Sequence, residues 1–187
     1  MNHDDWSWGT PDKLKWTVTS GVFTLKKWNS VIPGKKRWKS VGVDPGRNFG
    51  LCVLDDHNAT VYSGTLPKVP KTEKFLYGIA AFEVMTNVRR YMGDGPATVE
   101  GAAHKMPFGQ SDLAHIRMGY VLGLYYAGFA VDIAAPATIR KQALGSGKLG
   151  GLEVWPELDH NAGDAVAVAL YAAGLRVDQV DGTHLRS

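Results

Sequence analysis

Cysteine is nearly absent from this sequence: Cys52 is the single one among 187 residues. One thiol excludes an internal disulfide and any metal cluster built on cysteine, and it is typical of proteins from a reducing compartment. The chain also has no run of about 18 apolar residues, and its first residues, MNHDDWSWG, lack the basic and apolar parts of a secretory signal. We therefore expect a soluble, cytoplasmic protein without a transmembrane helix.

The net charge is only +3, but the charges are unevenly distributed. Residues 1–40 hold eight Lys or Arg against three Asp, together with five of the six tryptophans. Cations interleaved with flat aromatic rings suit phosphates and unstacked bases. The stretch LKWTVTSGVFTLKKW also alternates as a β-hairpin would, with Ser20 and Gly21 at the turn. Residues 1–39 are therefore expected to form a basic, tryptophan-rich extension, either a nucleic-acid-binding arm or a hairpin packed on the domain.

Residues 40–187 are predicted to form one domain in which strands and helices alternate. Three short runs, residues 40–44, 49–55 and 59–66, predict an antiparallel meander. The later elements are a helix over 71–92, a strand over 97–101, a helix over 111–128, a strand over 129–136, a short helix over 137–144, a loop over 145–158 and a helix over 159–174. The first helix is expected to face the core through residues at three- and four-residue spacing: Phe75, Ile79, Phe82, Met85, Val88 and Met92.

This order of elements predicts an α/β domain with a mixed five-stranded sheet flanked by helices, which resembles the ribonuclease H-like layout. In that layout Asp44 ends the first strand, Glu100 ends the fourth, and Asp164 lies in the first turns of the last helix. Because the first and fourth strands are neighbours, the three acids are expected to meet at one end of the sheet.

Such a cluster of acids repels itself unless cations neutralise it, and its hard oxygen ligands suit Mg²⁺ or Mn²⁺. Two such ions about 3.5–4 Å apart can activate a water and stabilise the leaving oxygen of a phosphodiester. In this interpretation Asp44 bridges both ions, and Pro45 and Gly46 turn the chain away from its oxygens. An Asp before Pro-Gly is by itself more often an ordinary turn former. The prediction therefore depends on the three acids together.

Four segments resemble the RuvC-type Holliday-junction resolvases over residues 40–173: VGVDPGRNFGLCVLD, ATVEG, IRMGYVLGLYYAGFAVDIAAPATIRKQALGSGK and NAGDAVAVAL. The resemblance implies a homodimeric, metal-dependent endonuclease that nicks two strands symmetrically across a four-way DNA junction. It also implies that Asp44, Glu100 and Asp164 are three of four metal ligands. Together with the N-terminal extension, the resemblance is compatible with a compact phage-type member acting in a bacterial or phage-infected host cell.

The fourth ligand of that family is an Asp or a His, and the matching residue here is Asn161. An amide oxygen can bind a hard cation, so Asn161 is the first choice, with His160 and then Asp159 as alternatives. This departure also keeps a second hypothesis open, a branched-DNA binding protein with reduced or lost nuclease activity. A second departure is the linker LGGLEVWPELDH, where the family has an additional helix.

DNA contacts are predicted for four cations, namely Lys105, Arg140, Lys141 and Lys148. The family places an aromatic wedge just after the catalytic Glu, where this chain has Ala103. Met106 and Phe108 are the nearby candidates for sensing a branch, although Phe108 could instead pack against the helix that begins near Ser111.

A pair of small residues marks the predicted helix over 111–128. Gly119 and Gly123 lie four apart among large apolar residues, a spacing that permits close approach of another helix. In the family that this chain resembles, the equivalent helix helps to form the dimer. The alternative is ordinary packing of this helix on the sheet.

Overall fold

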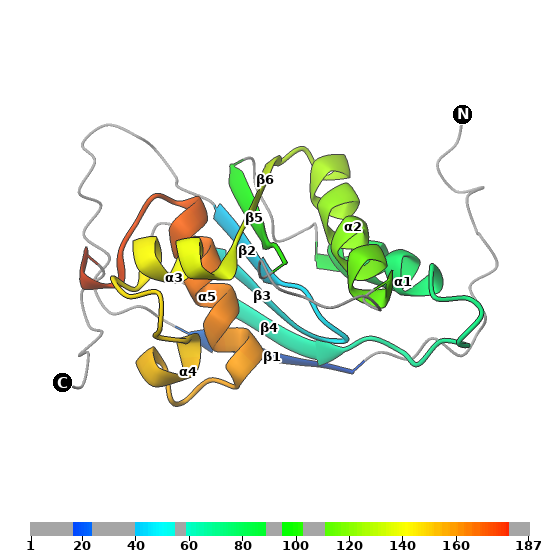
Figure 1. Cartoon of the computed structure of the whole chain (residues 1–187), viewed down its shortest axis with the longest axis horizontal. Helices are drawn as coiled ribbons and strands as arrows, with labels where there is room; N and C mark the ends of the chain where they lie inside the picture. The colour runs from blue at the N-terminus through cyan, green and yellow to red at the C-terminus, as the bar shows by residue number, and fades with distance from the viewer. Residues whose placement is uncertain (1–16, 24–39, 55–58, 89–94, 103–110, 180–187) are drawn as a thin grey trace.

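The computed structural model describes residues 17–23, 40–54, 59–88, 95–102 and 111–179, and these residues form one mixed sheet with helices on both faces (Figure 1). The sheet has six strands: β1 (Thr17–Phe23), β2 (Ser40–Asp44), β3 (Asn48–Leu54), β4 (Ala59–Thr65), β5 (Pro96–Glu100) and β6 (Ala130–Ala134). Their order in space is β1-β4-β3-β2-β5-β6. Strands β2, β3 and β4 are antiparallel neighbours, while β5 pairs in parallel with both β2 and β6. The predicted meander and mixed sheet are confirmed in β2 to β6.

Strand β1 corrects the prediction of a hairpin turn at Ser20 and Gly21. The two residues lie inside a continuous strand that pairs antiparallel with β4, with Ser20 opposite Tyr62 and Gly21 opposite Val61. The prediction failed because an alternating pattern is the same for a hairpin and for a strand that continues through its glycine. The basic and tryptophan residues of the extension lie outside the described residues, so a nucleic-acid-binding arm stays a prediction.

Two helical layers cover the sheet (Figure 1). Helices α1 (Leu76–Val88) and α2 (Ser111–Tyr126) enclose one apolar core with the sheet. Helix α5 (His160–Ala172), with α3 (Pro136–Ala143) and α4 (Gly151–Val154), encloses the other. A short 3₁₀ turn over Val177–Gln179 follows. Among the described residues, none of the helices has the length and apolar character that a membrane crossing requires.

Two glycines bring α5 close to the middle of the sheet. A Cβ atom on Gly42 would lie 2.1 Å from the backbone nitrogen of Ala169, and one on Gly50 would lie 1.9 Å from the backbone oxygen of Asn161. Any larger residue at either position would push the helix away. The close contact sets the first turns of α5 against the ends of β2 and β3, where the acids were expected to meet.

The buried face of α1 agrees with the predicted one at Met85 and differs from it at other positions. The structure buries Tyr77, Ala80, Ala81, Val84 and Met85, whereas Phe75 and Ile79 are 54% and 39% exposed. The prediction followed the large apolar residues, but α1 packs against α2 as well as the sheet, and there the small residues allow close contact. Phe82 is partly buried beside the ring of Tyr126. Met92 and the side chain of Val88 lie outside what the structure describes.

The small residues of α2 serve this helix pair. A Cβ atom on Gly119 would lie 2.1 Å from the carbonyl oxygen of Gly78, and one on Gly123 would lie 2.5 Å from Cβ of Met85. The two glycines therefore pack α2 on α1 of the same chain. The sequence analysis had assigned this spacing either to a dimer contact or to packing on the sheet, and the contact with α1 is neither of these.

The linker before α5 also differs from the prediction, since part of it is helical. Gly151–Val154 form the single turn α4, and Val154 and Trp155 are buried in the core. The predicted loop is therefore wrong over these residues, because a four-residue turn is too short to show a helical period.

Candidate active site

The carboxyl ends of β2 and β5 bring two of the predicted acids side by side. The parallel register pairs Val43 with Val99, and Asp44 and Glu100 are the residues that follow. Asp164, in the second turn of α5, lies close enough to both for its charge to raise their pKa values. Donor atoms of Asp44, Asp164 and His160 lie within 4.8 Å of one another. Asp44 thus shares one site with His160 and Asp164, which follow it in the chain by 116 and 120 positions.

Asp164 is the most buried of these acids, at 4% exposure, and three groups hold its carboxylate. Oδ1 accepts a hydrogen bond from the backbone N–H of Gly151 at 2.6 Å. Oδ2 lies 3.2 Å from Nη2 of Arg140 and 3.4 Å from Nδ1 of His160. The orientation of the Asp164 carboxylate is therefore fixed before any cation binds.

Gly151 is a functional residue that the sequence analysis missed. A Cβ atom there would lie 2.0 Å from the carbonyl carbon of Gly163, so only glycine lets α4 approach α5 closely enough to donate its N–H to Asp164. The available signal was the pair of glycines at 150 and 151, inside the predicted loop over 145–158.

Burial and mutual repulsion raise the pKa values of two of the acids. Burial, followed by the charge of Asp164, raises the pKa of Asp44 to about 7. Burial, followed by the charges of Asp44 and Asp164, raises the pKa of Glu100 to about 7. Arg140 acts in the opposite direction on both pKa values, and Arg117 does so on that of Glu100. Buried carboxylates with too little positive charge around them are a donor set that fits a hard divalent cation.

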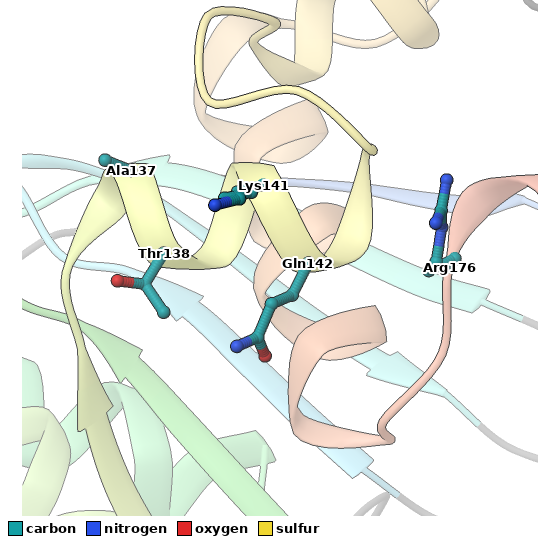
Figure 2. Close-up of a pocket in the computed structure, with 5 residues that line it drawn as sticks. All are labelled: Ala137, Thr138, Lys141, Gln142 and Arg176. Atoms are coloured by element: carbon teal, nitrogen blue, oxygen red, sulfur yellow. The ribbon is translucent and has the colours of Figure 1, made fainter.

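Arg140 and Lys141 lie on different sides of α3. Arg140 pairs with Asp164 inside the acid cluster, and its buried Nε has no hydrogen-bond partner among the described residues. Lys141 is exposed and lines a hollow of about 700 Å³ with Ala137, Thr138, Gln142 and Arg176 (Figure 2). Figure 2 shows that Arg176 projects from the segment after α5, whereas the other lining residues project from α3.

Of the remaining predicted DNA contacts, the structure describes Lys148. Lys148 is exposed, and its backbone N–H donates to Oγ of Ser146 at 3.3 Å. Lys105, Met106 and Phe108, like Ala103, lie outside the described residues.

The three candidates for the fourth ligand differ in what their donor atoms already do. Asp159 caps α5, with Oδ1 accepting from the N–H of Ala162 at 2.9 Å and Oδ2 accepting from the hydroxyl of Ser63. His160 is exposed, and its Nδ1 lies among the acids. Asn161 is partly buried on the same helical turn. The occupied oxygens of Asp159 make it the least available of the three.

Arg117 of α2 is a second residue that the sequence analysis missed. Its Nε–H donates to the backbone carbonyl oxygen of Glu100 at 3.0 Å. No pattern in the sequence indicates this bond, because its acceptor is a main-chain atom that every residue carries.

The fold and this site can be compared with known proteins. No family model matches the chain, and no curated protein matches its sequence. The chain is similar to the solved structure of Thermus thermophilus RuvC, with a TM-score of 0.53, 22% identity, and coverage of 73% of this chain and 93% of that one. It is also similar to T. thermophilus RuvC in complex with a Holliday junction substrate, with a TM-score of 0.51, 21% identity and the same coverage. The fold is therefore RuvC-like, as predicted.

Proposed function

We propose that this protein is a divalent-metal-dependent endonuclease that resolves four-way DNA junctions by paired, symmetric nicks. The observation that carries the proposal is the convergence of Asp44, Glu100 and Asp164 from two adjacent strand ends and one helix. These acids occur on a fold that is similar to that of T. thermophilus RuvC, a protein whose structure has been solved with a Holliday junction substrate. That likeness supports branched DNA as the partner.

Asp44, Glu100 and Asp164, with Asn161 or His160, would hold Mg²⁺ or Mn²⁺, two ions to each site. When bound, the two ions supply activation of a water and stabilisation of the leaving oxygen of a phosphodiester. The protein's own groups prepare the ligands. The N–H of Gly151 orients Asp164, and Arg140 offsets part of the negative charge that raises the pKa values of Asp44 and Glu100.

Phosphate contacts are proposed for the exposed Lys141 and Lys148, together with Lys105 and Arg140. Arg176 also lines the hollow beside Lys141, but its Nη2 lies 3.1 Å from Oδ2 of Asp178, so Lys141 is the cation that this side of α3 offers to a DNA backbone. Arg140 would approach a phosphate from within the acid cluster. Met106 and Phe108 are proposed to sense the opened crossover, where base pairs are easily unstacked.

A homodimer is proposed through the outer face of α2. Met118, Leu122, Tyr125 and Tyr126 are each at least half exposed on this helix, at 55%, 51%, 74% and 50%. Contiguous exposed apolar residues of this size mark interaction surfaces. Two sites related by a two-fold axis would allow both strands of a symmetric junction to be cut.

The alternative is a branched-DNA binding protein with reduced or lost nuclease activity, and Asn161 is the observation in its favour. A nicking assay on a synthetic four-way junction, with matched linear duplex and with Mg²⁺ or EDTA, separates the two. Metal-dependent nicks confined to the junction support the endonuclease. Tight junction binding without nicks in Mg²⁺ or Mn²⁺ supports the binding protein.

A further inference from the structure

We propose that Arg117 is a positioning residue for Glu100, acting by fixing the peptide group that joins Glu100 to Gly101. The inference rests on the proposed function, because it concerns one of the three acids of that site. The Nε–H of Arg117 donates to the carbonyl oxygen of Glu100 at 3.0 Å. The N–H of Gly101 donates to the carbonyl oxygen of Ala134 at 2.7 Å. Both polar atoms of this single peptide unit are therefore bonded, one to α2 and one to the end of β6.

A peptide plane that is held at both ends restricts rotation about the Cα–C bond of Glu100. The direction in which the Cα–Cβ bond of Glu100 leaves the main chain is then set by the backbone, at the residue where strand β5 ends. The contact with Ala134 is close, since a Cβ atom on Gly101 would lie 3.1 Å from the carbonyl oxygen of Ala134 and 3.2 Å from Cγ2 of Ile133. A side chain at this position would therefore crowd the end of β6 beside the second bond.

The helix that carries Arg117 is itself firmly packed. Its neighbours Ile116 and Tyr120 are 1% and 0% exposed, and Gly119 contacts Gly78 of α1. Only arginine has an N–H group in the middle of a cationic side chain, where it can meet a main-chain oxygen while the terminal nitrogens stay free for other contacts. A lysine would keep the charge but would lose this bond.

Arg117→Lys and Arg117→Gln test the inference, with Arg176→Lys as the matched control on the far side of α3. The first readout is Mn²⁺ affinity without DNA, measured by titration calorimetry. The second is kcat and KM for junction nicking. Loss of a partner that orients a metal ligand costs about 10–100-fold in metal affinity or activity. Both Arg117 variants should show a loss of this size in Mn²⁺ affinity and in kcat, with KM and metal-free junction affinity within about twofold of wild type.

Gly101→Ala disturbs the same peptide from its other end, so it serves as the second variant if an Arg117 variant fails to fold, and it too should weaken Mn²⁺ binding. The inference is overturned if the folded variants bind Mn²⁺ as wild type does, whether or not their melting temperature falls. It is also overturned if junction affinity falls while Mn²⁺ affinity is unchanged, because Arg117 would then be a phosphate contact. A wild type that neither binds Mn²⁺ nor nicks junctions would instead refute the proposed function.

Discussion

Replacing Asp44 by Asn should stabilise the metal-free protein in a manner that depends on pH. The folded-state pKa of Asp44 is about 7, above its ordinary value of 3.8, first because of burial and then because of the charge of Asp164. Ionisation of Asp44 therefore opposes folding. The penalty is absent below the ordinary pKa, grows between the two values and is complete above the folded-state pKa.

The size of the effect follows from the same shift. A carboxyl pKa raised from 3.8 to about 7 corresponds to about 4 kcal/mol when the group is fully ionised. Asp44→Asn should therefore raise the free energy of unfolding by up to about 4 kcal/mol near pH 8 and by about 2 kcal/mol near pH 5, where about half of the penalty is left. The control Asp132→Asn, at an exposed position of β6, should change stability by less than about 0.5 kcal/mol at either pH.

Urea denaturation in EDTA at the two pH values measures this difference. Adding Mg²⁺ near pH 8 should then stabilise wild type, since a cation that binds only the folded state shifts the equilibrium toward it, and should stabilise Asp44→Asn much less. An equal gain for Asp44→Asn at both pH values, or a loss near pH 8, would refute the view that Asp44 belongs to a self-repelling cluster.

Four further predictions concern the fourth ligand, the phosphate contacts, the sensing of a branch and the dimer. Asn161→Ala should lower nicking and Asn161→Asp should keep or raise it; a silent Asn161→Ala beside an inactive His160→Ala would transfer the role to His160. Lys141→Ala should reduce the salt dependence of junction affinity by about one counterion, and an unchanged slope would place the DNA elsewhere. Phe108→Ala should impair cleavage of intact junctions and spare those with mismatched centres, since their unstacking cost is already removed, while equal losses with a lower melting temperature would indicate packing. Leu122→Glu should give a monomer by light scattering, and a dimer would exclude the outer face of α2.

The parts of the fold that the sequence predicted are those where pattern and position agree. Asp44 and Glu100 each end an apolar run, and the order of elements makes their strands neighbours, so their meeting could be predicted. Ser20 and Gly21 could not be placed correctly, because β1 continues through them to pair with the edge of β4. The buried face of α1 was predicted correctly at Met85 but not at Phe75 and Ile79, since part of the contact with α2 is made by the small residues Gly78 and Ala81.

The contacts that support the site could not be predicted from the sequence, for a different reason. The bonds from Gly151 to Asp164 and from Arg117 to Glu100 each use a main-chain atom, which leaves no trace in side-chain pattern. Arg140 and Lys141 were both predicted to contact phosphates, but one residue along a helix is about 100° of rotation. That rotation directs Arg140 to Asp164 and leaves Lys141 at the surface.

Cleavage of a supercoiled plasmid that extrudes an inverted repeat as a four-way junction tests the central claim most directly. Two coordinated nicks convert the plasmid to the linear form, a single nick gives the open circle, and Asp164→Asn is the matched control. With Mg²⁺, wild type should produce linear plasmid cut at the repeat, and Asp164→Asn should bind the junction without cutting, because the acid cluster serves chemistry and the basic surface serves binding. Plasmid that stays supercoiled or yields only open circles with wild type would contradict paired resolution by this site.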